Sequence, residues 1–386
     1  MAHCPTILSQ MLKLFSGYEF EKLVFKHQAE YHARGVRSWS HLVAMLFGQL
    51  AGQDSLRGIE AGLATQGRHL YHLGVTPMSR SSLAYANAHR PAALFEDLFY
   101  RMLSKCAAIA PRHKFRFKNP LYSIDASLIR LCLSLFDWAK FRKTKGAVKL
   151  HVKFNHAGYI PNFALLTTGK VHDSQIAPKI PLESGDVAVM DRAYLDYSYL
   201  YSLENKGVFF VTRLKSNSRF RIIKRRSHAQ SNICADQIIE LTGYYTRQNY
   251  PGPLRRVVAK DPETKKRIVL LTNQLEWSPA TIAAIYKDRW QIEIFFKTLK
   301  QQLKVKSFVG TSENALLSQL WTALIAYLLL SYLKFKSKFQ WSLYTLSSII
   351  PTNLFSRRDL WDWLNNPYKP SILPNLGLKQ TQLRFG

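Results

Sequence analysis

The stretch "YKDRWQIEIFFKTLKQQL", residues 286–303, predicts an α-helix with two different faces. At about 100° per residue, its apolar side chains gather on one side, where they can pack: Ile292, Phe295, Phe296, Leu299 and Leu303. A second face is a wedge roughly 80° wide. With the residue that follows the stretch, this wedge comprises Tyr286, Arg289, Glu293, Lys297, Lys300 and Lys304. One carboxylate therefore lies in a row of four cations, and this raises the question of what the row holds.

The overall charge of the chain points to a polyanionic partner. Its 386 residues carry a net charge of +29, from 54 Lys and Arg against 25 Asp and Glu. DNA or RNA is the first candidate and an anionic membrane the second, although a basic protein can also be merely soluble. The hydrophobic content of 47% and the aromatic content of 13% indicate a globular chain. Its length allows two or three domains and a sizeable core.

One apolar segment, "ALLSQLWTALIAYLLLSYLKF" at residues 315–335, is long enough to suggest a membrane span. Polar residues at Ser318, Gln319, Thr322 and Ser331 interrupt it, which favours a buried core helix over a membrane helix. The N-terminus lacks the basic start and long apolar region of a signal peptide. The four cysteines show neither CxxC nor zinc spacing, which suits reduced thiols. We therefore expect a cytoplasmic protein that does not enter a membrane.

Residues 1–118 are expected to form a helical N-terminal DNA-binding domain, because apolar residues recur there at spacings of three and four. Within it, Ser79 can cap a short helix that presents Arg80, Asn87 and Arg90. Two short helices joined by a Gly/Pro turn are compatible with a helix-turn-helix that reads DNA. The alternative is a helical hairpin that only packs.

Residues 119–350 change to an α/β pattern. The segments "LYSIDASLIRLCLSLF", "AVKLHVKFN" and "NFALLTTG" read as adjacent antiparallel strands, and a strand–helix–strand unit begins near residue 185. This order predicts a mixed sheet with flanking helices. A polar, turn-rich insertion containing β-strands is expected at about residues 216–275. Residues 351–386 are expected to be an irregular C-terminal tail.

Three carboxylates stand out by position. Asp125, in "YSIDAS", and Asp191, in "VAVMDRAY", each end a predicted strand, while Glu293 lies on the charged helix face. Functional groups collect beyond the carboxyl ends of strands in open α/β sheets, so these acids are expected to lie close together. Three carboxylates form a hard oxygen site that suits Mg²⁺ or Mn²⁺. Two such ions can activate a water or a 3′-hydroxyl and stabilise the leaving oxygen of a phosphodiester.

Each of these acids also has an ordinary structural explanation. Asp191 precedes a helix and can cap it, and Glu293 can pair with Arg289 and Lys297 on a helix surface. Asp173, in "TGKVHDSQ", is the strongest rival to Asp191, but a short apolar strand leads straight into Asp191. Four other acids of the region are not assigned to the site: Asp137, Asp186, Asp196 and Asp288. The neighbouring histidines do not have the spacing of a zinc site: His151, His156 and His172.

Taken together, the motifs resemble a known family. The spacing Y-x2-R-x3-E-x6-K, at Tyr286, Arg289, Glu293 and Lys300, resembles the signature of insertion-sequence transposases of the IS4 family, within the DDE superfamily. The segments "SIDASLI" and "VMDRAYLDY" are similar to that family's first and second Asp motifs. "TGKVHDSQ" resembles a stretch common between them. The resemblance covers residues 121 to about 305 in the right order.

The resemblance implies an RNase H-like catalytic fold, interrupted before the Glu helix by a β-rich insertion. It also implies that Asp125, Asp191 and Glu293 bind two Mg²⁺ or Mn²⁺ ions. The implied activity is strand cleavage at insertion-sequence ends and strand transfer into target DNA, with a homodimer joining two terminal inverted repeats. Two other functions remain open, namely an RNase H-like nuclease without strand transfer and a non-catalytic DNA-binding protein derived from a transposase.

The resemblance further implies which residues grip phosphates at the transposon end: Tyr286, Arg289 and Lys300. Lys297 and Lys304 extend the row on the helix face and are expected to contact DNA as well, although the family signature does not name them. The entrance to the insertion, "RLKSNSRFRIIKRR", holds seven basic residues and no acidic one: Arg213, Lys215, Arg219, Arg221, Lys224, Arg225 and Arg226. These are expected to contact DNA, with a solvated loop as the alternative. Some family members stack a flipped base on a Trp in the last insertion strand; here Ile268 stands near that place, with Trp277 and Trp290 nearby.

Overall fold

The computed structural model describes residues 4–31, 33, 35–132, 136–142, 145–261, 265–305 and 308–368. Its α-helices are α1 (Ile7–Leu12), α2 (Gly17–Lys26), α3 (Ser38–Leu50), α4 (Leu56–Ala64), α5 (Gly67–Leu70), α6 (Arg80–His89), α7 (Ala93–Ile109), α8 (Asp173–Ile176), α9 (Tyr197–Asn205), α10 (Tyr244–Asn249), α11 (Pro279–Asp288), α12 (Trp290–Gln301), α13 (Glu313–Lys336), α14 (Leu343–Asn353) and α15 (Leu360–Asn365). Its strands are β1 (Leu121–Leu131), β2 (Lys140–Arg142), β3 (Lys145–Asn155), β4 (Ile160–Thr168), β5 (Val187–Met190), β6 (Phe209–Arg213), β7 (Phe220–Arg225), β8 (Ile233–Leu241), β9 (Leu254–Lys260) and β10 (Arg267–Thr272). The described chain is therefore a mixture of helices and strands, as predicted.

The strands form one mixed sheet. β3 pairs antiparallel with both β1 and β4, while β5 and β6 continue from β1 in parallel. The crossover between β5 and β6 runs through α9, which matches the predicted strand–helix–strand unit. This arrangement of three antiparallel strands followed by two parallel ones confirms the expected mixed α/β, RNase H-like fold class.

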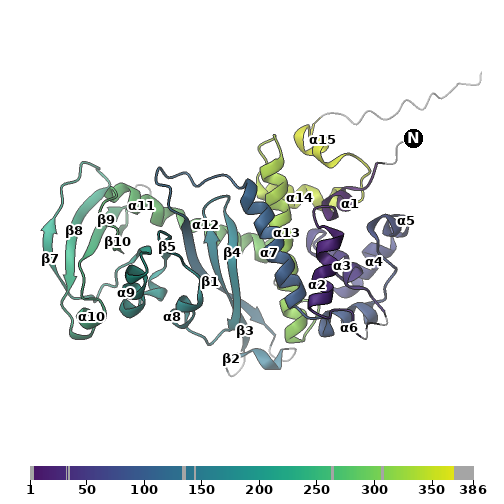
Figure 1. Cartoon of the computed structure of the whole chain (residues 1–386), viewed down its shortest axis with the longest axis horizontal. Coiled ribbons are helices and arrows are strands. Elements are labelled where there is room, and N and C mark those ends of the chain that lie inside the picture. Colours follow the sequence, from purple (N-terminus) through teal and green to yellow (C-terminus); the bar gives the residue numbers. More distant parts are fainter. Residues whose placement is uncertain are drawn as a thin grey trace, which may run out of the picture.

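The segment before the Glu293 helix contributes further strands to the same sheet. β10 pairs antiparallel with β6, and the order continues through β9 and β8 to β7. In Figure 1 these strands form the end of the molecule farthest from the N-terminal helices, with β7 outermost. The β-rich insertion is thus an extension of the central sheet.

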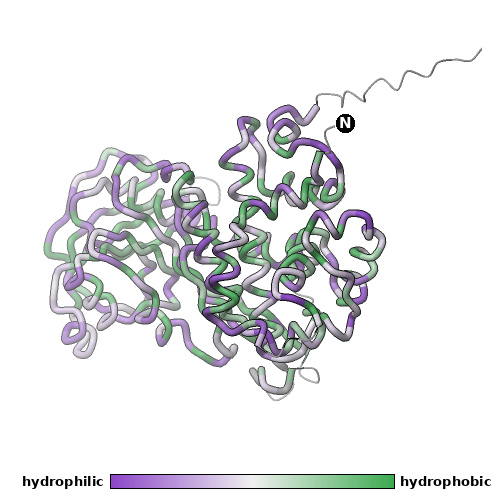
Figure 2. Tube along the Cα trace, turned by 45° about the vertical axis from the view of Figure 1, so that its right-hand side comes forward, coloured by the Kyte–Doolittle hydropathy of each residue, from purple (hydrophilic) through white to green (hydrophobic). Residues whose placement is uncertain are grey.

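The helical half of the molecule is built around α13. Figure 1 shows α13 and α7 standing between the sheet and the N-terminal helices. The most apolar 18-residue window of α13 is long and apolar enough to cross a membrane, but 89% of it is buried inside the molecule. Figure 2 shows hydrophobic stretches of chain in the interior and hydrophilic stretches on outer loops and helix faces. One hydrophobic cluster runs continuously from α1 through α13 to β1, β3 and β4, so residues 1–118 share a core with the sheet.

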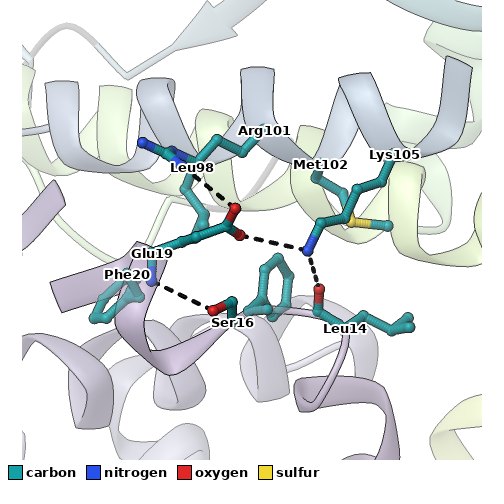
Figure 3. A pocket seen from close by; sticks show the side chains of 9 residues that line it. Leu14, Ser16, Glu19, Phe20, Leu98, Arg101, Met102 and Lys105 are labelled. Carbon is teal, nitrogen blue, oxygen red and sulfur yellow. Dashed lines mark hydrogen bonds and ion pairs between the residues drawn. The ribbon is translucent and has the colours of Figure 1, made fainter. Parts of the chain in front are cut away.

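A polar contact fixes α2 against α7 at the edge of this core (Figure 3). Ser16 caps α2 by accepting a hydrogen bond from the Glu19 amide. The Glu19 carboxylate then lies 3.7 Å from Arg101 and 3.6 Å from Lys105, both on α7. Lys105 also donates to the Leu14 carbonyl. These groups are partly exposed, so the contact orients the helices more than it stabilises them.

The prediction that a helix after Ser79 presents three residues to DNA is wrong for two of them. Ser79 does cap α6, and Arg80 is exposed. Asn87 and Arg90, however, are buried, and the Arg90 guanidinium donates to the carbonyls of Ala29 and Val36. Residue type alone suggested exposure, but here the arginine satisfies backbone carbonyls of the preceding segment.

Arg90→Ala is expected to lower the free energy of unfolding by about 2–4 kcal/mol, because it leaves buried carbonyls without donors. Urea denaturation measures this. Arg80→Ala, at an exposed position of the same helix, is the control and should change stability by less than about 0.5 kcal/mol. An Arg90 variant of wild-type stability with weakened DNA binding would restore the original interpretation.

Candidate active site

Two of the predicted acids lie side by side on paired strands: Asp191 directly follows the end of β5, and Asp125 lies inside β1, just past the segment that pairs with β5. The parallel register joins Ile124 of β1 to Met190 of β5, so Asp125 and Asp191 occupy the next position along each strand. Side chains alternate between the faces of a sheet. Because Leu121 and Val187 pack in the cluster that includes α11, residues 125 and 191 face that same side. The predicted proximity of the two acids is therefore supported, but the prediction that Asp125 ends its strand is wrong, because β1 continues beside β3 as far as Leu131.

The predicted single helix over residues 286–303 is divided in the structure. α11 ends at Asp288 and α12 begins at Trp290. Around Arg289 the backbone makes i→i−3 hydrogen bonds, from the Arg289 amide to Tyr286 and from the Ile292 amide to Arg289. These bonds tighten the turn at the junction. The predicted apolar side chains are nevertheless buried: Ile292, Phe295, Phe296 and Leu299 on α12, and Leu303 just after it.

Arg289, at this junction, joins two of the carboxylates. Its Nη1 lies 2.9 Å from Asp125 Oδ2, and its Nη2 lies 2.7 Å from Glu293 Oε1. The side chains are only partly exposed, at 12% for Arg289, 21% for Asp125 and 34% for Glu293. The Arg289–Glu293 pair is the i,i+4 contact that the ordinary explanation anticipated, but the same guanidinium also reaches across to the sheet.

Asp191, the remaining acid, has a tyrosine and a second arginine beside it. Tyr286 Oη lies 3.4 Å from Asp191 Oδ1. Asp191 makes no side-chain cap to the short 3₁₀ turn that follows it, so the capping explanation fails here. Arg213 ends β6 in register with Asp191, and it hydrogen-bonds Tyr286. The site therefore brings together the three predicted acids and three of the residues predicted to contact DNA: Asp125, Asp191 and Glu293, with Arg213, Tyr286 and Arg289.

The electrostatics of the site favour a bound cation. Burial raises the pKa of Asp125 to about 6, and the nearby carboxylates of Asp191 and Glu293 add to this against the opposing effect of Arg289. Tyr194 lies behind the acids, and burial together with the charges of Asp173, Asp125 and Asp191 raises the pKa of its hydroxyl. That hydroxyl is buried and has no hydrogen-bond partner among the described residues. The acids thus crowd negative charge into a half-buried space.

The donor set fits a hard divalent cation, although the acids are not arranged as a ligand shell. Within the described part of the chain, no three His, Cys, Asp or Glu side chains are placed to hold one ion together. Arg289 instead lies between two of the carboxylates and supplies the positive charge. Carboxylate oxygens are the ligands that Mg²⁺ and Mn²⁺ prefer, so the residues suit such an ion chemically.

A hollow between β1 and α12 brings cations to the acids. Its lining includes Asp125, Glu293, Lys297 and Lys300. Lys300 Nζ donates to Ser127 Oγ at 2.6 Å and to the Leu128 carbonyl, both on β1. Lys297 is exposed on the rim.

Lys304 does not continue the predicted row. α12 has ended at Gln301, and Lys304 has a left-handed backbone with φ of 46°. Its side chain lies beside Gly52 of the N-terminal helices. The helical spacing that placed Lys304 in the wedge does not extend to this position.

The basic stretch that opens the insertion is divided between two places. Arg213 belongs to the site, and Lys215 Nζ donates to the Leu195 carbonyl at 3.4 Å. The remaining members lie on or beside β7: Arg219, Arg221, Lys224, Arg225 and Arg226. Arg221 pairs with Glu240, and Arg226 pairs with Asp236. Four strand spacings separate β7 from β6, about 19 Å, so the cations of β7 lie apart from Arg213 and the acids.

The rival acids are engaged elsewhere. Asp173 pairs with Lys149 at 3.2 Å. Asp186 accepts the Glu183 amide, and Asp196 caps α9. The side chain of Asp137 lies outside the described residues.

Sequence reasoning considered several residues near Arg289 but gave them no role. The pair Asp288 and His156 is buried directly behind it and bonds at 2.7 Å. Trp290 begins α12 and is 59% exposed. Trp277, by contrast, stacks on Phe117 with ring centroids 4.1 Å apart. The only available signal was adjacency, since Asp288 and Trp290 flank Arg289 in the sequence.

Comparison with known proteins assigns the chain to a family. Residues 116–329 match the family described as "Transposase DDE domain", and residues 3–76 match a domain of unknown function, DUF4372. The chain is 31% identical over 306 residues to y4zB of Sinorhizobium fredii, which is named as a transposase; the match covers 77% of this chain and 84% of that protein. It is 31% identical over 253 residues to the Geobacillus stearothermophilus protein named as a transposase for insertion sequence element IS5377, covering 65% and 66% of the two chains.

Two further similarities are more distant. The chain is 21% identical over 198 residues to transposase InsG for insertion sequence element IS4 of Escherichia coli, covering 48% and 43% of the two chains. Among solved structures, it superposes on piggyBac transposase in a synaptic complex with hairpin DNA with a TM-score of 0.45 and 14% identity, over 97% and 86% of the two chains. The family match itself spans more than half of the chain and contains all three acids. The chain therefore belongs to the DDE-domain transposases, and its insertion-sequence relatives place it in the IS4 family.

Proposed function

We propose that this protein binds the ends of an insertion sequence, cleaves a strand there in a reaction that depends on Mg²⁺ or Mn²⁺, and transfers the freed 3′ end into target DNA. The observation that carries the proposal is the convergence of Asp125, Asp191 and Glu293 around Arg289 and Tyr286. Acids are costly beside one another unless cations join them. A protein that merely bound DNA would have no use for acids facing phosphate.

The proposed ligands of the metal ions are Asp125, Asp191 and Glu293, which supply hard oxygen donors. Asp125 and Glu293 line the hollow. Two divalent ions, when bound, supply charge that activates a water or 3′-hydroxyl and stabilises the leaving oxygen. The protein's own part is to orient these carboxylates. β1 and β5 hold two of them in register, and α12 holds the third.

The proposed phosphate contacts are the cations around the acids. Lys297 and Lys300 line the hollow. Arg289 contacts Asp125 and Glu293, Arg213 contacts Tyr286, and Tyr286 can donate its hydroxyl. Arginine suits phosphate because its planar fork donates in pairs. The exposed cations of β7 would instead contact DNA away from the cleaved bond.

The proposed assembly is a homodimer on DNA, because the two ends of an element must be held together for transfer. Terminal inverted repeats and target DNA would be its substrates. We propose that residues 1–118 bind the ends and that the protein works in the cytoplasm, at the nucleoid.

The direct test is Mn²⁺- or Mg²⁺-dependent cleavage of a labelled duplex carrying the terminal inverted repeat of the element itself. Asp125→Ala, Asp191→Ala and Glu293→Gln are each expected to lower the cleavage rate on the order of 10³-fold or more, because each removes a proposed metal ligand. Asp173→Ala is the matched control and should cleave like the wild type. End binding, measured in parallel, should survive in Glu293→Gln.

Other outcomes of this experiment separate the rival functions. Activity lost in Asp173→Ala but kept in Asp191→Ala would reverse the assignment of the second acid. Cleavage without joining to a target duplex would indicate a nuclease without strand transfer. Tight, specific end binding without any cleavage by the wild type would indicate a non-catalytic DNA-binding protein.

Lys297→Ala should weaken binding to cut ends and reduce the slope of log K against log salt by about 1, because one phosphate contact is lost. Lys206→Ala is the charge-matched control, since this exposed lysine precedes the amino end of β6, away from the strand ends that carry the acids. Fluorescence anisotropy at several salt concentrations measures both variants. An unchanged slope for Lys297→Ala would remove it from the phosphate contacts.

A further inference from the structure

A buried chain of hydrogen bonds begins at Ser123, two residues before Asp125, and takes no part in the proposed metal or phosphate contacts. Ser123 Oγ lies 2.7 Å from His156 Nε2, and His156 Nδ1 lies 2.7 Å from Asp288 Oδ2. Asp288 also accepts from Lys114 Nζ at 2.5 Å and from the Tyr159 hydroxyl at 3.1 Å. All three residues are buried, with exposed fractions of 0% for Ser123, 1% for His156 and 5% for Asp288. The chain of hydrogen bonds is therefore sealed from solvent.

The direction of the hydrogen bonds follows from the chemistry of the three groups. Burial alone would raise the pKa of Asp288, but hydrogen bonds from His156 and Lys114 outweigh it and lower the pKa. An ionised carboxylate only accepts, so His156 Nδ1 carries the proton that it donates. Burial lowers the pKa of His156, which favours the neutral ring. Its Nε2 is then the acceptor for the Ser123 hydroxyl.

This order of groups is that of a nucleophile, a base and an orienting acid, but no substrate can use it. Ser123 lies inside β1, which is paired on both sides, with β3 and with β5. Its side chain has no exposed surface. The chain of hydrogen bonds must therefore act by holding neighbouring segments of the structure in place.

What it holds is the junction that carries Arg289. Ser123 and Asp125 are two residues apart on β1, so their side chains face the same side of the sheet. Asp288 and Arg289 are neighbours at the junction between α11 and α12. The hydrogen-bond chain ties residue 288 to residue 123 through His156, and the ion pair ties residue 289 to residue 125. Two attachments to one strand fix both the position and the rotation of the junction.

We propose that Ser123, His156 and Asp288 are positioning residues, which hold the α11–α12 junction so that Arg289 and Glu293 face Asp125. The proposal rests on the proposed function of the acids. Its basis is that a misplacement of about 1 Å at a reacting centre can cost on the order of 10²-fold in rate. The buried hydrogen-bond chain is the element of the structure that prevents such a shift.

The test is the variant Asp288→Asn, which keeps the shape of the side chain and removes its charge. Single-turnover cleavage of the labelled end should slow by about 10- to 100-fold, while the Kd for the end stays within about twofold of the wild type. The control is Asp97→Asn on α7. Asp97 is bonded in the same way, to Lys26 Nζ at 2.5 Å and to His27 Nε2 at 2.7 Å, but among the N-terminal helices. It should cleave at the wild-type rate.

A double variant separates positioning from general destabilisation. If Asp288 acts through Arg289, the variant carrying both Asp288→Asn and Arg289→Ala should cleave no more slowly than Arg289→Ala alone. Losses that multiply would overturn the proposal. Should Asp288→Asn fail to fold, Tyr159→Phe removes one hydrogen bond to Asp288 and should slow cleavage about fivefold, with the same non-additivity.

The outcomes distinguish this proposal from the proposed function. An active wild type with an Asp288→Asn variant of equal rate overturns the positioning role alone. A weakened end affinity with an unchanged cleavage rate also overturns it. A wild type that binds ends without cleaving them overturns the proposed function, and the positioning role with it.

Discussion

The parallel pairing of β1 with β5 is the constraint on which the site depends. It joins Leu121–Ile124 to Val187–Met190, so the residue after each paired segment is an aspartate. A slip of one residue would move Asp191 to the other face of the sheet from Asp125. The register is secured by apolar side chains that alternate between two separate clusters, one of them containing α11. The buried core therefore determines where the polar acids lie.

The acids and Arg289 stabilise each other in a way that neither could alone. Burial and mutual repulsion raise the pKa of Asp125, which is a cost that the protein bears at this site. Arg289 offsets part of it by binding Asp125 and Glu293 with one planar guanidinium. A site that already requires positive charge is prepared for metal ions and phosphate groups in the roles proposed here. The crowding of these carboxylates lowers the stability of the fold, which is consistent with a functional role, since stability alone would favour fewer acids.

The sequence predicted the elements well and their long-range contacts poorly. Periodicity identified the buried face of α12 and the two strands that position the aspartates, because these patterns are local. It did not show that β1 continues past Asp125 to Leu131. It did not reveal the break at Arg289, since apolar spacing continues through a tightened turn. Arg90 was misplaced because its carbonyl partners belong to another segment. The basic stretch that begins at Arg213 was treated as one surface, because strand order within the sheet cannot be read from composition. Asp288 was set aside because its partner, His156, is 132 residues away.

The position of the insertion links it mechanically to the site. β10 pairs with β6, and its Leu270 lies opposite Arg213, the residue in register with Asp191. A separate domain on a flexible linker could bind DNA without affecting the acids, whereas a strand within the same sheet cannot shift alone, because its ladder bonds fix its neighbour. A displacement of β7 caused by contacts of its exposed cations would therefore be transmitted through β8, β9 and β10 to the strand that carries Arg213. If β7 contacts DNA as proposed, the insertion would align that DNA with the acids as an extension of the same sheet.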